Sequence, residues 1–328
     1  MKNVLITGGA GFIGSNLAKK IQEQFPDCLI TIFDKFNTTE KRINGNFKYL
    51  GDYKNIIGLN CIIKVGDISN ENDVIQLLKG QYDVIFHQGA ISDTTVLNQE
   101  EVLKTNLETF NLFLNYCKHN CSKLIYASSA GTYGNTISPN IVGIGEIPEN
   151  IYGFSKLCMD EVARKFIKNN KNILVVGLRY FNVYGPGELY KRKTSSMILQ
   201  LANQAINQNK VKLFKFGEQK RDFVYINDVV EANINATYGL SGVYNIGSGQ
   251  SRTFLEILKN IEINLNKKVQ IEFIDNPYSF YQNNTLADLS KSIEGINYKP
   301  KYSLESGIKE YMKIILNYSN REWDDFEK

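Results

Sequence analysis

The sequence predicts an α/β fold, in which a doubly wound parallel sheet is followed by a smaller mixed α/β C-terminal lobe. In the first half of the chain, short apolar runs alternate with helical patterns, as in parallel strands joined by crossover helices. After Arg179 the pattern changes to short strands and helices in mixed order. At 328 residues, the chain is long enough for two domains or one large α/β unit.

The expected elements follow from apolar periodicity and from the polar residues between them. Strands are predicted over residues 1–6, 29–33, 61–65, 83–87, 123–127, 173–178 and 211–214, and helices over 12–24, 194–208 and 227–238. An irregular polar stretch runs from Asp34 to about Asn60. In such a sheet, ligands bind beyond the carboxyl ends of the strands.

A glycine-rich turn joins the first strand to the first helix. Gly8 would permit the tight turn, Gly11 would let backbone N–H groups approach a pyrophosphate, and Gly14 would let the helix pack closely on the sheet. Such turns also join elements that bind nothing, but the strand–helix–strand context favours a dinucleotide site. We therefore expect a Rossmann-like dinucleotide-binding domain over 1–178, to which segments near 215–240 return, and mainly a substrate-binding lobe over 179–328.

The end of the second strand bears on which dinucleotide binds. Asp34 follows Gly14 at the spacing of about 20 residues at which an acidic side chain meets the adenosine ribose, which favours NAD. Lys35, Lys41 and Arg42 follow closely, and a cation there could hold a 2′-phosphate, which favours NADP. The three cations could equally belong to a solvated loop.

Composition excludes several classes of partner. The net charge of +4 is too small and too dispersed to indicate nucleic-acid binding, but it suits an anionic small-molecule substrate. The chain enters its first strand at once and has no apolar run of membrane-spanning length, so we expect a cytoplasmic protein with no membrane partner. Five scattered cysteines and two histidines indicate reduced thiols and no metal site.

Three side chains form the candidate catalytic group. Tyr152 and Lys156 lie one turn apart at the start of a predicted helix, so both can reach one site. The ammonium would lower the pKa of the tyrosine, which could then take a proton from an alcohol while hydride leaves to a nicotinamide. Ser129, at the end of an upstream strand, would orient that alcohol, with Ser128 as the second candidate. Separately, each feature also fits an exposed pair or a local hydroxyl contact.

With these residues in this order, the chain resembles the extended short-chain dehydrogenase/reductase family, which contains nucleotide-sugar epimerases and dehydratases. Longer segments resemble members that invert C6 of an ADP-activated heptose for the inner core of lipopolysaccharide. These segments cover residues 86–95, 126–130, 179–186, 220–225 and 287–289. The resemblance runs to about residue 318 and implies an isomerase that uses NADP, or alternatively NAD, and forms a homo-oligomer.

The resemblance also implies two sets of binding residues. Those expected around the cofactor are Gly8, Gly11, Phe12, Ile13, Gly14, Asp34, Lys35, Lys41, Lys54, Gln88, Gly89, Ala90, Ile91, Ser92, Asn106, Lys156 and Val183. Those expected to contact the sugar nucleotide are Ser129, Asn182, Lys191, Ser196, Asn203, Phe214, Lys215, Phe216, Gly217, Arg221 and Tyr281. A guanidinium such as that of Arg221 can bind two phosphate oxygens at once, although it could also be a surface charge.

A second acid/base group is expected, because one group cannot easily serve both orientations of a ketone that turns over between hydride transfers. The family pattern supplies a lysine after the turn at 182–186, which points to Lys191. Gly187 stands where arginine is common and the following loop is longer, so Lys193 is the alternative. Either lysine could also be a solvated loop cation.

Three other functions occur on the same fold. A nucleotide-sugar 4,6-dehydratase usually has Asp-Glu directly after the active-site hydroxyl, where this chain has Ala130 and Gly131. A nucleotide-sugar 4-epimerase would use the same Ser, Tyr and Lys set, because only the pose of the sugar decides which carbon reacts. A non-catalytic NAD(P)-binding sensor would typically lack the tyrosine and the lysine.

Overall fold

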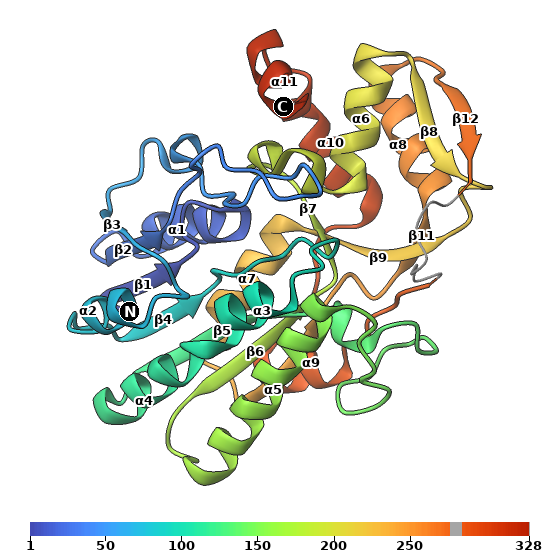
Figure 1. Ribbon diagram of the computed structural model, residues 1–328. Helices are drawn as coiled ribbons and strands as arrows, with labels where there is room; N and C mark the ends of the chain where they lie inside the picture. The colour runs from blue at the N-terminus through green and yellow to red at the C-terminus, as the bar shows by residue number, and fades with distance from the viewer. Residues whose placement is uncertain (276–283, 328) are drawn as a thin grey trace.

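A seven-stranded parallel sheet is the centre of the larger part of the protein (Figure 1). The structure is a computed structural model and describes residues 1–275 and 284–327. The strand order is β10-β6-β5-β4-β1-β2-β3. The strands are β1 (Asn3–Thr7), β2 (Leu29–Asp34), β3 (Ile62–Val65), β4 (Val84–His87), β5 (Lys123–Ser129), β6 (Val175–Tyr180) and β10 (Gly242–Ile246). From β1 the strands run outward to β2 and β3 on one side of the sheet and to β4, β5, β6 and β10 on the other. The strand order therefore reverses between β1 and β4, and an open α/β sheet leaves a crevice for ligands at such a point.

The register brings the carboxyl ends of the central strands to one edge. Thr7 at the end of β1 lies opposite Phe33 of β2 and His87 of β4. Farther along the sheet, Ser129 of β5 lies opposite Tyr180 of β6. Side chains from strands that are far apart in sequence therefore meet along this edge.

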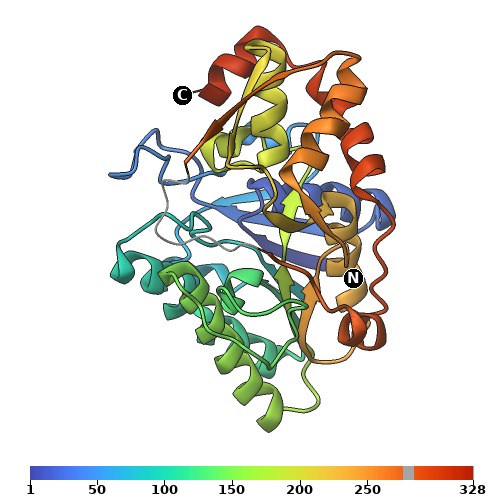
Figure 2. The ribbon, with the colours of Figure 1, turned by 90° about the vertical axis from the view of Figure 1, so that its right-hand side faces the viewer.

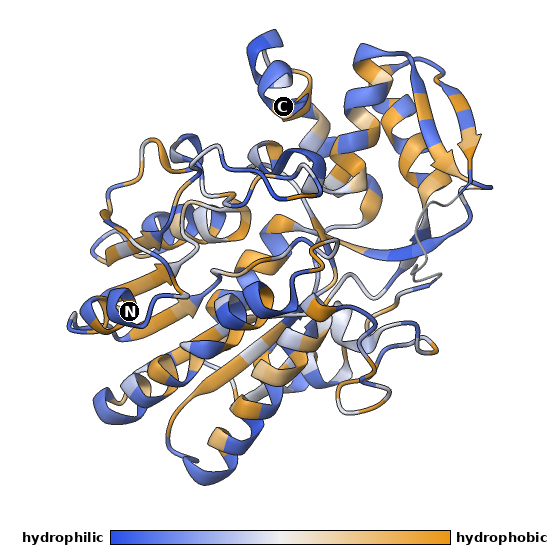
Figure 3. Cartoon of the chain, viewed as in Figure 1, coloured by the Kyte–Doolittle hydropathy of each residue, from blue (hydrophilic) through white to orange (hydrophobic). Residues whose placement is uncertain are grey.

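Helices cover both faces of this sheet (Figure 2). One face carries α2 (Glu71–Leu77), α4 (Phe110–Asn120) and α5 (Ile151–Asn169), and the other carries α1 (Phe12–Gln24) and α7 (Ile226–Ala236). Because successive side chains of a strand point to opposite faces, Leu5 joins the first layer and Ile6 the second. The strands are accordingly apolar along their length, whereas the outer helix surfaces are hydrophilic (Figure 3).

The smaller lobe lies above the carboxyl edge of the sheet (Figure 2). It contains a parallel pair of strands, β8 (Lys210–Phe214) and β12 (Gln270–Ile274), with α6 (Met197–Asn207) and α8 (Phe254–Leu265). A three-stranded sheet of β11 (Ser251–Thr253), β9 (Lys220–Tyr225) and β7 (Asn182–Tyr184) joins this lobe to the rest. Shorter elements are η1 (Tyr53–Ile56), α3 (Gln99–Leu103), η2 (Lys104–Glu108), η3 (Ala130–Tyr133), η4 (Leu189–Thr194), α9 (Ser290–Ile296), α10 (Leu304–Ile315) and α11 (Asn320–Glu327).

The structure confirms the parallel sheet and differs from the sequence-based expectation in the second half. The helix expected over 194–208 is divided, because Ser196 caps α6 by accepting a hydrogen bond from the Leu199 N–H, and the preceding turn is the separate 3₁₀ segment η4. The sheet also gains β10 from beyond residue 240, paired with β6. The proposed domain limits at 178 and 179 stay a prediction.

Within residues 1–275 and 284–327, no helix has both the length and the apolar character needed to cross a membrane. In the same residues, no group of three or more histidine, cysteine, aspartate or glutamate side chains is arranged to hold a metal ion.

Candidate active site

A cavity of about 1000 Å³ runs along the carboxyl edge of the sheet and reaches the smaller lobe. Its floor includes Gly8 after β1, Asp34 at the end of β2, Gln88 after β4 and Ser129 at the end of β5. The opposite wall comes from η4 and the start of α6. The cavity therefore lies at the switch point of the sheet, between the two parts of the chain.

The glycine turn at one end of this cavity has the geometry of a phosphate cradle. Gly8 has a φ of +65°, and a Cβ there would lie 2.7 Å from the Gly89 Cα. A Cβ on Gly14 would lie 2.3 Å from the Gly8 carbonyl oxygen, so helix α1 approaches the turn too closely for any side chain. No side chain caps α1 at Gly11, which leaves the first N–H groups of this helix for an anion. These residues fit a dinucleotide pyrophosphate.

Asp34 is held by the backbone around it. Its carboxylate accepts hydrogen bonds from the N–H groups of Ala10 (2.9 Å) and Phe36 (3.1 Å). Burial raises its pKa, and these hydrogen bonds act in the opposite direction. The nearby cations are paired: Lys35 lies 2.6 Å from Asp67, and Arg42 lies 3.2 Å from Glu101. Lys35 and Arg42 line the cavity.

Tyr152 and Lys156 both line the cavity from the first turns of α5. Asn150 fixes the start of this helix by accepting a hydrogen bond from the Gly153 N–H at 2.8 Å. The Lys156 Nζ donates to the Ala127 carbonyl oxygen at 2.8 Å, and burial lowers the pKa of this lysine to about 8. Both side chains therefore reach one cavity, and their catalytic role stays a prediction.

The pKa of Tyr152 shifts in the opposite direction from the sequence-based expectation. Burial of the phenol raises its pKa, and the hydroxyl of Ser129 opposes that shift. Burial is the larger of these two effects, and the Lys156 ammonium donates to the Ala127 carbonyl oxygen rather than to the phenol. In the protein without ligands, Tyr152 is therefore a protonated phenol at neutral pH.

The two serines of the strand end have different surroundings. Ser128 donates to the buried Asp160 carboxylate at 2.9 Å, and that carboxylate also accepts from Tyr126 (2.9 Å) and Arg179 Nε (2.8 Å). Both serines line the cavity, but the Ser128 hydroxyl is committed to this core network. Ser129 therefore suits the orienting role better.

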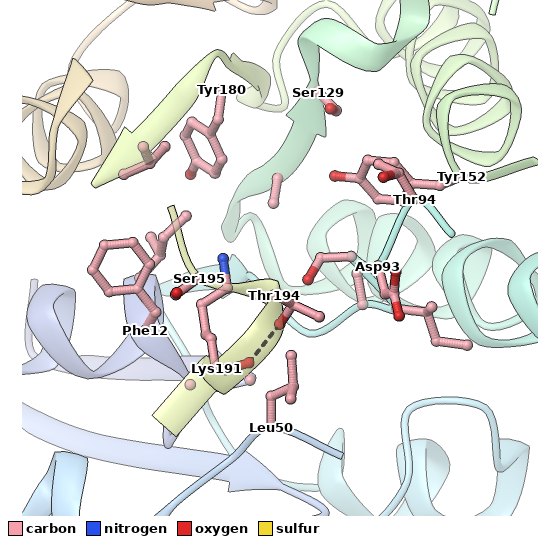
Figure 4. A pocket seen from close by; sticks show the side chains of 18 of the residues that line it. Phe12, Leu50, Asp93, Thr94, Ser129, Tyr152, Tyr180, Lys191, Thr194 and Ser195 are labelled. Atoms are coloured by element: carbon pink, nitrogen blue, oxygen red, sulfur yellow. Dashed lines mark hydrogen bonds between the residues drawn. The ribbon is translucent and has the colours of Figure 1, made fainter. Parts of the chain in front are cut away.

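Lys191 approaches the cavity from the other side. It lies on η4, and its Nζ points into the cavity (Figure 4) and lies 5.5 Å from the centroid of the Phe12 ring. Burial lowers its pKa, whereas the charges of Glu188 and Asp93 raise it. The Thr194 hydroxyl donates to the Lys191 carbonyl oxygen at 2.7 Å and closes the turn (Figure 4). The alternative, Lys193, also lines the cavity but is exposed to solvent.

Most of the predicted binding residues line this cavity. They are Gly8, Gly11, Phe12, Ile13, Gly14, Asp34, Lys35, Gln88, Gly89, Ala90, Ile91, Ser92, Ser129, Lys156, Asn182, Val183, Lys191, Ser196, Phe214 and Arg221. Those that do not line it are Lys41, Lys54, Asn106, Asn203, Lys215, Phe216 and Gly217. Tyr281 lies outside the residues that the structure describes.

Three of the residues outside the cavity wall have structural partners instead. Lys54 pairs with Asp325 of α11 at 2.8 Å. The Asn106 side chain accepts from the Ile91 N–H at 2.8 Å and donates to its carbonyl, so it supports the segment that forms the cavity wall. Asn203 donates to Glu327.

Sequence reasoning missed two polar residues that line the cavity. Tyr180 donates to the Gln88 side chain at 3.0 Å and lines the cavity between β6 and α1. Thr94, after β4, lines the same cavity (Figure 4). Thr94 and Tyr180 both belong to segments that carry the family resemblance. Tyr180 could have been predicted from its position at the end of a parallel strand.

The buried ammonium of Lys156 leads to a testable pH dependence. Its folded pKa of about 8 is below the ordinary 10.5, so between these values the unfolded chain binds more protons and stability rises with pH. Relative to Lys156→Met, the free energy of unfolding of the native protein should gain roughly 3 kcal/mol across this window, at about 1.4 kcal/mol per pH unit. Urea unfolding at pH 7.5, 9 and 10.5 measures the difference. A constant difference would mean that Lys156 is not desolvated.

The whole chain is similar to known enzymes that act on sugar nucleotides. Residues 4–247 match the model of the NAD-dependent epimerase/dehydratase family. The chain is 35% identical to an ADP-L-glycero-D-manno-heptose-6-epimerase of Brachyspira hyodysenteriae, over 95% of this chain and 97% of that protein. The solved structure of the Helicobacter pylori ADP-L-glycero-D-manno-heptose-6-epimerase is 47% identical and covers 97% of each chain, with a TM-score of 0.88.

A more distant solved structure contains a cofactor. The Bacillus cereus UDP-glucuronic acid 4-epimerase, in a complex with a fluorinated UDP-sugar and NAD, is 26% identical. It covers 96% of this chain and 99% of that chain, with a TM-score of 0.82.

Proposed function

Because this chain belongs to the NAD-dependent epimerase/dehydratase family, we propose that it inverts C6 of the heptose in ADP-glycero-manno-heptose by transient oxidation. The substrate is inferred from the two similar proteins that carry the name of this 6-epimerase. One observation supports the reaction type: Tyr152 and Lys191 point into one cavity from different elements (Figure 4). The product would be a heptose donor for the inner core of lipopolysaccharide.

The residues present fit a nicotinamide dinucleotide. The glycine turn and the N-terminus of α1 would hold its pyrophosphate, Asp34 would face the adenosine ribose, and Lys156 would hold the nicotinamide ribose. When bound, the cofactor supplies a hydride acceptor that returns the same hydride later. It would also add a positive charge beside Tyr152, which favours the phenolate that burial alone disfavours.

Proton transfer is assigned to two residues on different sides of the sugar. One of them, Tyr152 or Lys191, takes the proton from the hydroxyl at C6 as the carbon is oxidised. After the ketone turns over, the other residue returns a proton to the oxygen. Ser129 would hold the oxygen in the first orientation, since its hydroxyl lies at the strand end that lines the cavity.

The smaller lobe would bind the ADP part of the substrate. Arg221 of β9 lines the cavity and is only 8% exposed, and its guanidinium donates to the Lys220 carbonyl oxygen at 2.9 Å, which helps to fix its position. A fixed guanidinium suits two oxygens of a diphosphate. Asn182, Ser196 and Phe214 line the same part of the cavity and complete the proposed subsite.

We further propose that the cofactor is NADP, with NAD as the alternative. Lys35 lines the cavity next to Asp34 and would meet a 2′-phosphate there, so Lys35→Ala should weaken NADP binding about tenfold or more, as expected for one charge-assisted contact. NAD binding should change less. Lys20→Ala is the matched control, because Lys20 also pairs with a carboxylate but lies outside the cavity. Calorimetric titration with both dinucleotides measures the preference. Tighter binding of NAD than of NADP to the native protein would show that NAD is the cofactor.

Proton NMR of ADP-D-glycero-D-manno-heptose incubated with the purified protein and catalytic NADP or NAD tests the proposed reaction. The L-glycero epimer should form without net reduction of the cofactor. Conversion of UDP-hexoses in place of the heptose would favour a 4-epimerase, and loss of water would favour a dehydratase. Binding of cofactor and sugar with no turnover would favour a sensor. The cytoplasmic location and the homo-oligomeric state stay predictions from the sequence.

A further inference from the structure

Glu188 is a buried carboxylate that the reaction scheme above leaves without a role. It lies between β7 and η4, with a side chain that is 0% exposed. Its carboxylate accepts hydrogen bonds from the Gly185 N–H at 3.2 Å, the Ser196 N–H at 2.6 Å and the Ser196 hydroxyl at 2.8 Å. One side chain thus joins the two ends of the segment 185–196, which carries Lys191.

The same residue is linked to Lys191 through backbone and charge. The Lys191 N–H donates to the Glu188 carbonyl oxygen at 2.9 Å. The two side chains also influence each other electrostatically, since the Glu188 charge raises the pKa of Lys191 and the ammonium lowers the pKa of Glu188. Asp93, from the segment after β4, is the other carboxylate that faces Lys191.

Three phenols lie in the surroundings of Glu188. They belong to Tyr184 in β7, Tyr311 in α10 and Tyr318 after α10, and the Glu188 charge raises the pKa of each of them. All three phenols are uncharged near neutral pH. Among the described residues, the charged group that acts on the Glu188 carboxylate is the Lys191 ammonium. Burying a carboxylate is costly unless it has partners, and this one has both hydrogen bonds and a cation.

We propose that Glu188 is the positioning residue for Lys191: its hydrogen bonds fix the segment that carries the lysine, and its carboxylate places a negative charge in the surroundings of the ammonium. This inference rests on the proposed role of Lys191 as the second acid/base group. Glu188 does not line the cavity, so it acts through Lys191 rather than on the substrate.

Glu188→Gln separates positioning by charge from mere structural support. A glutamine keeps the size of the side chain and one acceptor oxygen, but it removes the negative charge and places an NH2 group where the other oxygen accepts from a backbone N–H. We expect the amine of Lys191 to titrate about one pH unit lower in this variant, as for loss of a neighbouring opposite charge. The high-pH decline of kcat should move in the same direction, and kcat at neutral pH should fall about tenfold or more through misplacement of the lysine.

The measurement uses the full-length protein after reductive methylation with 13C-formaldehyde, with the Lys191 signal assigned from Lys191→Arg. Asp228→Asn is the matched control, because Asp228 is also buried and accepts two backbone N–H groups, from Lys301 and Tyr302. Its Lys191 titration should equal that of the native protein. The NMR titration needs no turnover, so it tests the Glu188 inference even if the native protein does not epimerise the heptose, which would refute only the proposed function.

The possible outcomes are distinct. A lower titration pH of Lys191 in Glu188→Gln, but not in Asp228→Asn, supports the inference. An unchanged Lys191 titration in Glu188→Gln, with or without a lower melting temperature, overturns it and leaves Glu188 a structural residue. An equal shift in both variants also overturns it, because the effect would then come from general loosening of the fold.

Discussion

Tyr152→Phe is expected to lower kcat by about 10²- to 10⁴-fold, the usual contribution of a positioned acid/base group. The substitution removes only the phenolic oxygen, so cofactor affinity should stay within about twofold, because that oxygen belongs to no cofactor-holding group in this account. The measurements are the rate of epimer formation by NMR and cofactor binding by titration. The phenol lines the cavity and interacts with Ser129.

Tyr116→Phe is the matched control for this variant. Tyr116 is also a buried phenol, and it donates to the Gly80 carbonyl oxygen at 2.9 Å, but it lies at the end of α4 away from the cavity. Its loss should lower stability and leave kcat unchanged. Full activity of Tyr152→Phe would remove Tyr152 from the mechanism.

Lys191→Met is expected to have the second large effect, again about 10²- to 10⁴-fold on kcat. Methionine keeps the length and the apolar stem of the side chain, so its contact with Phe12 can persist while the ammonium is lost. Since the remaining acid/base group serves one orientation of the ketone, oxidation of one of the two epimers should still occur but inversion should fail. Hydride exchange between cofactor and substrate, without epimer, is the specific signature.

Lys193→Met tests the alternative assignment of the second acid/base group. Lys193 is exposed, whereas the Lys191 Nζ points into the cavity (Figure 4), so we expect this variant to keep kcat within about threefold, the size of a peripheral contact. The reverse result, with Lys193→Met inactive and Lys191→Met active, would transfer the role to Lys193.

Local sequence features predicted the first half of the fold well. The helix Phe12–Gln24 has the predicted bounds because a glycine turn fixes its start and its apolar face is regular. The central parallel strands were recognisable as continuous apolar runs, since both of their faces are covered, whereas the edge strand β3 is largely exposed. The capping of α5 by Asn150 likewise fixed the start of the helix that carries Tyr152 and Lys156.

Features that depend on contacts distant in sequence could not be predicted in this way. The pairing of β10 with β6 joins segments more than sixty residues apart, and nothing within either strand specifies its partner. The commitment of Ser128 to Asp160 depends on the packing of α5 against the sheet. The raised pKa of Tyr152 depends on burial, which residue spacing does not reveal.

The central claim is that C6 is inverted through a transient ketone whose hydride is returned to the same carbon. The most direct test is epimerisation of ADP-D-glycero-D-manno-heptose labelled with deuterium at C6, in ordinary water, followed by mass and NMR analysis of the product. We predict that the L-glycero product keeps the deuterium at C6. Replacement of the deuterium by solvent hydrogen would show that inversion proceeds by proton abstraction from carbon, and would contradict the account.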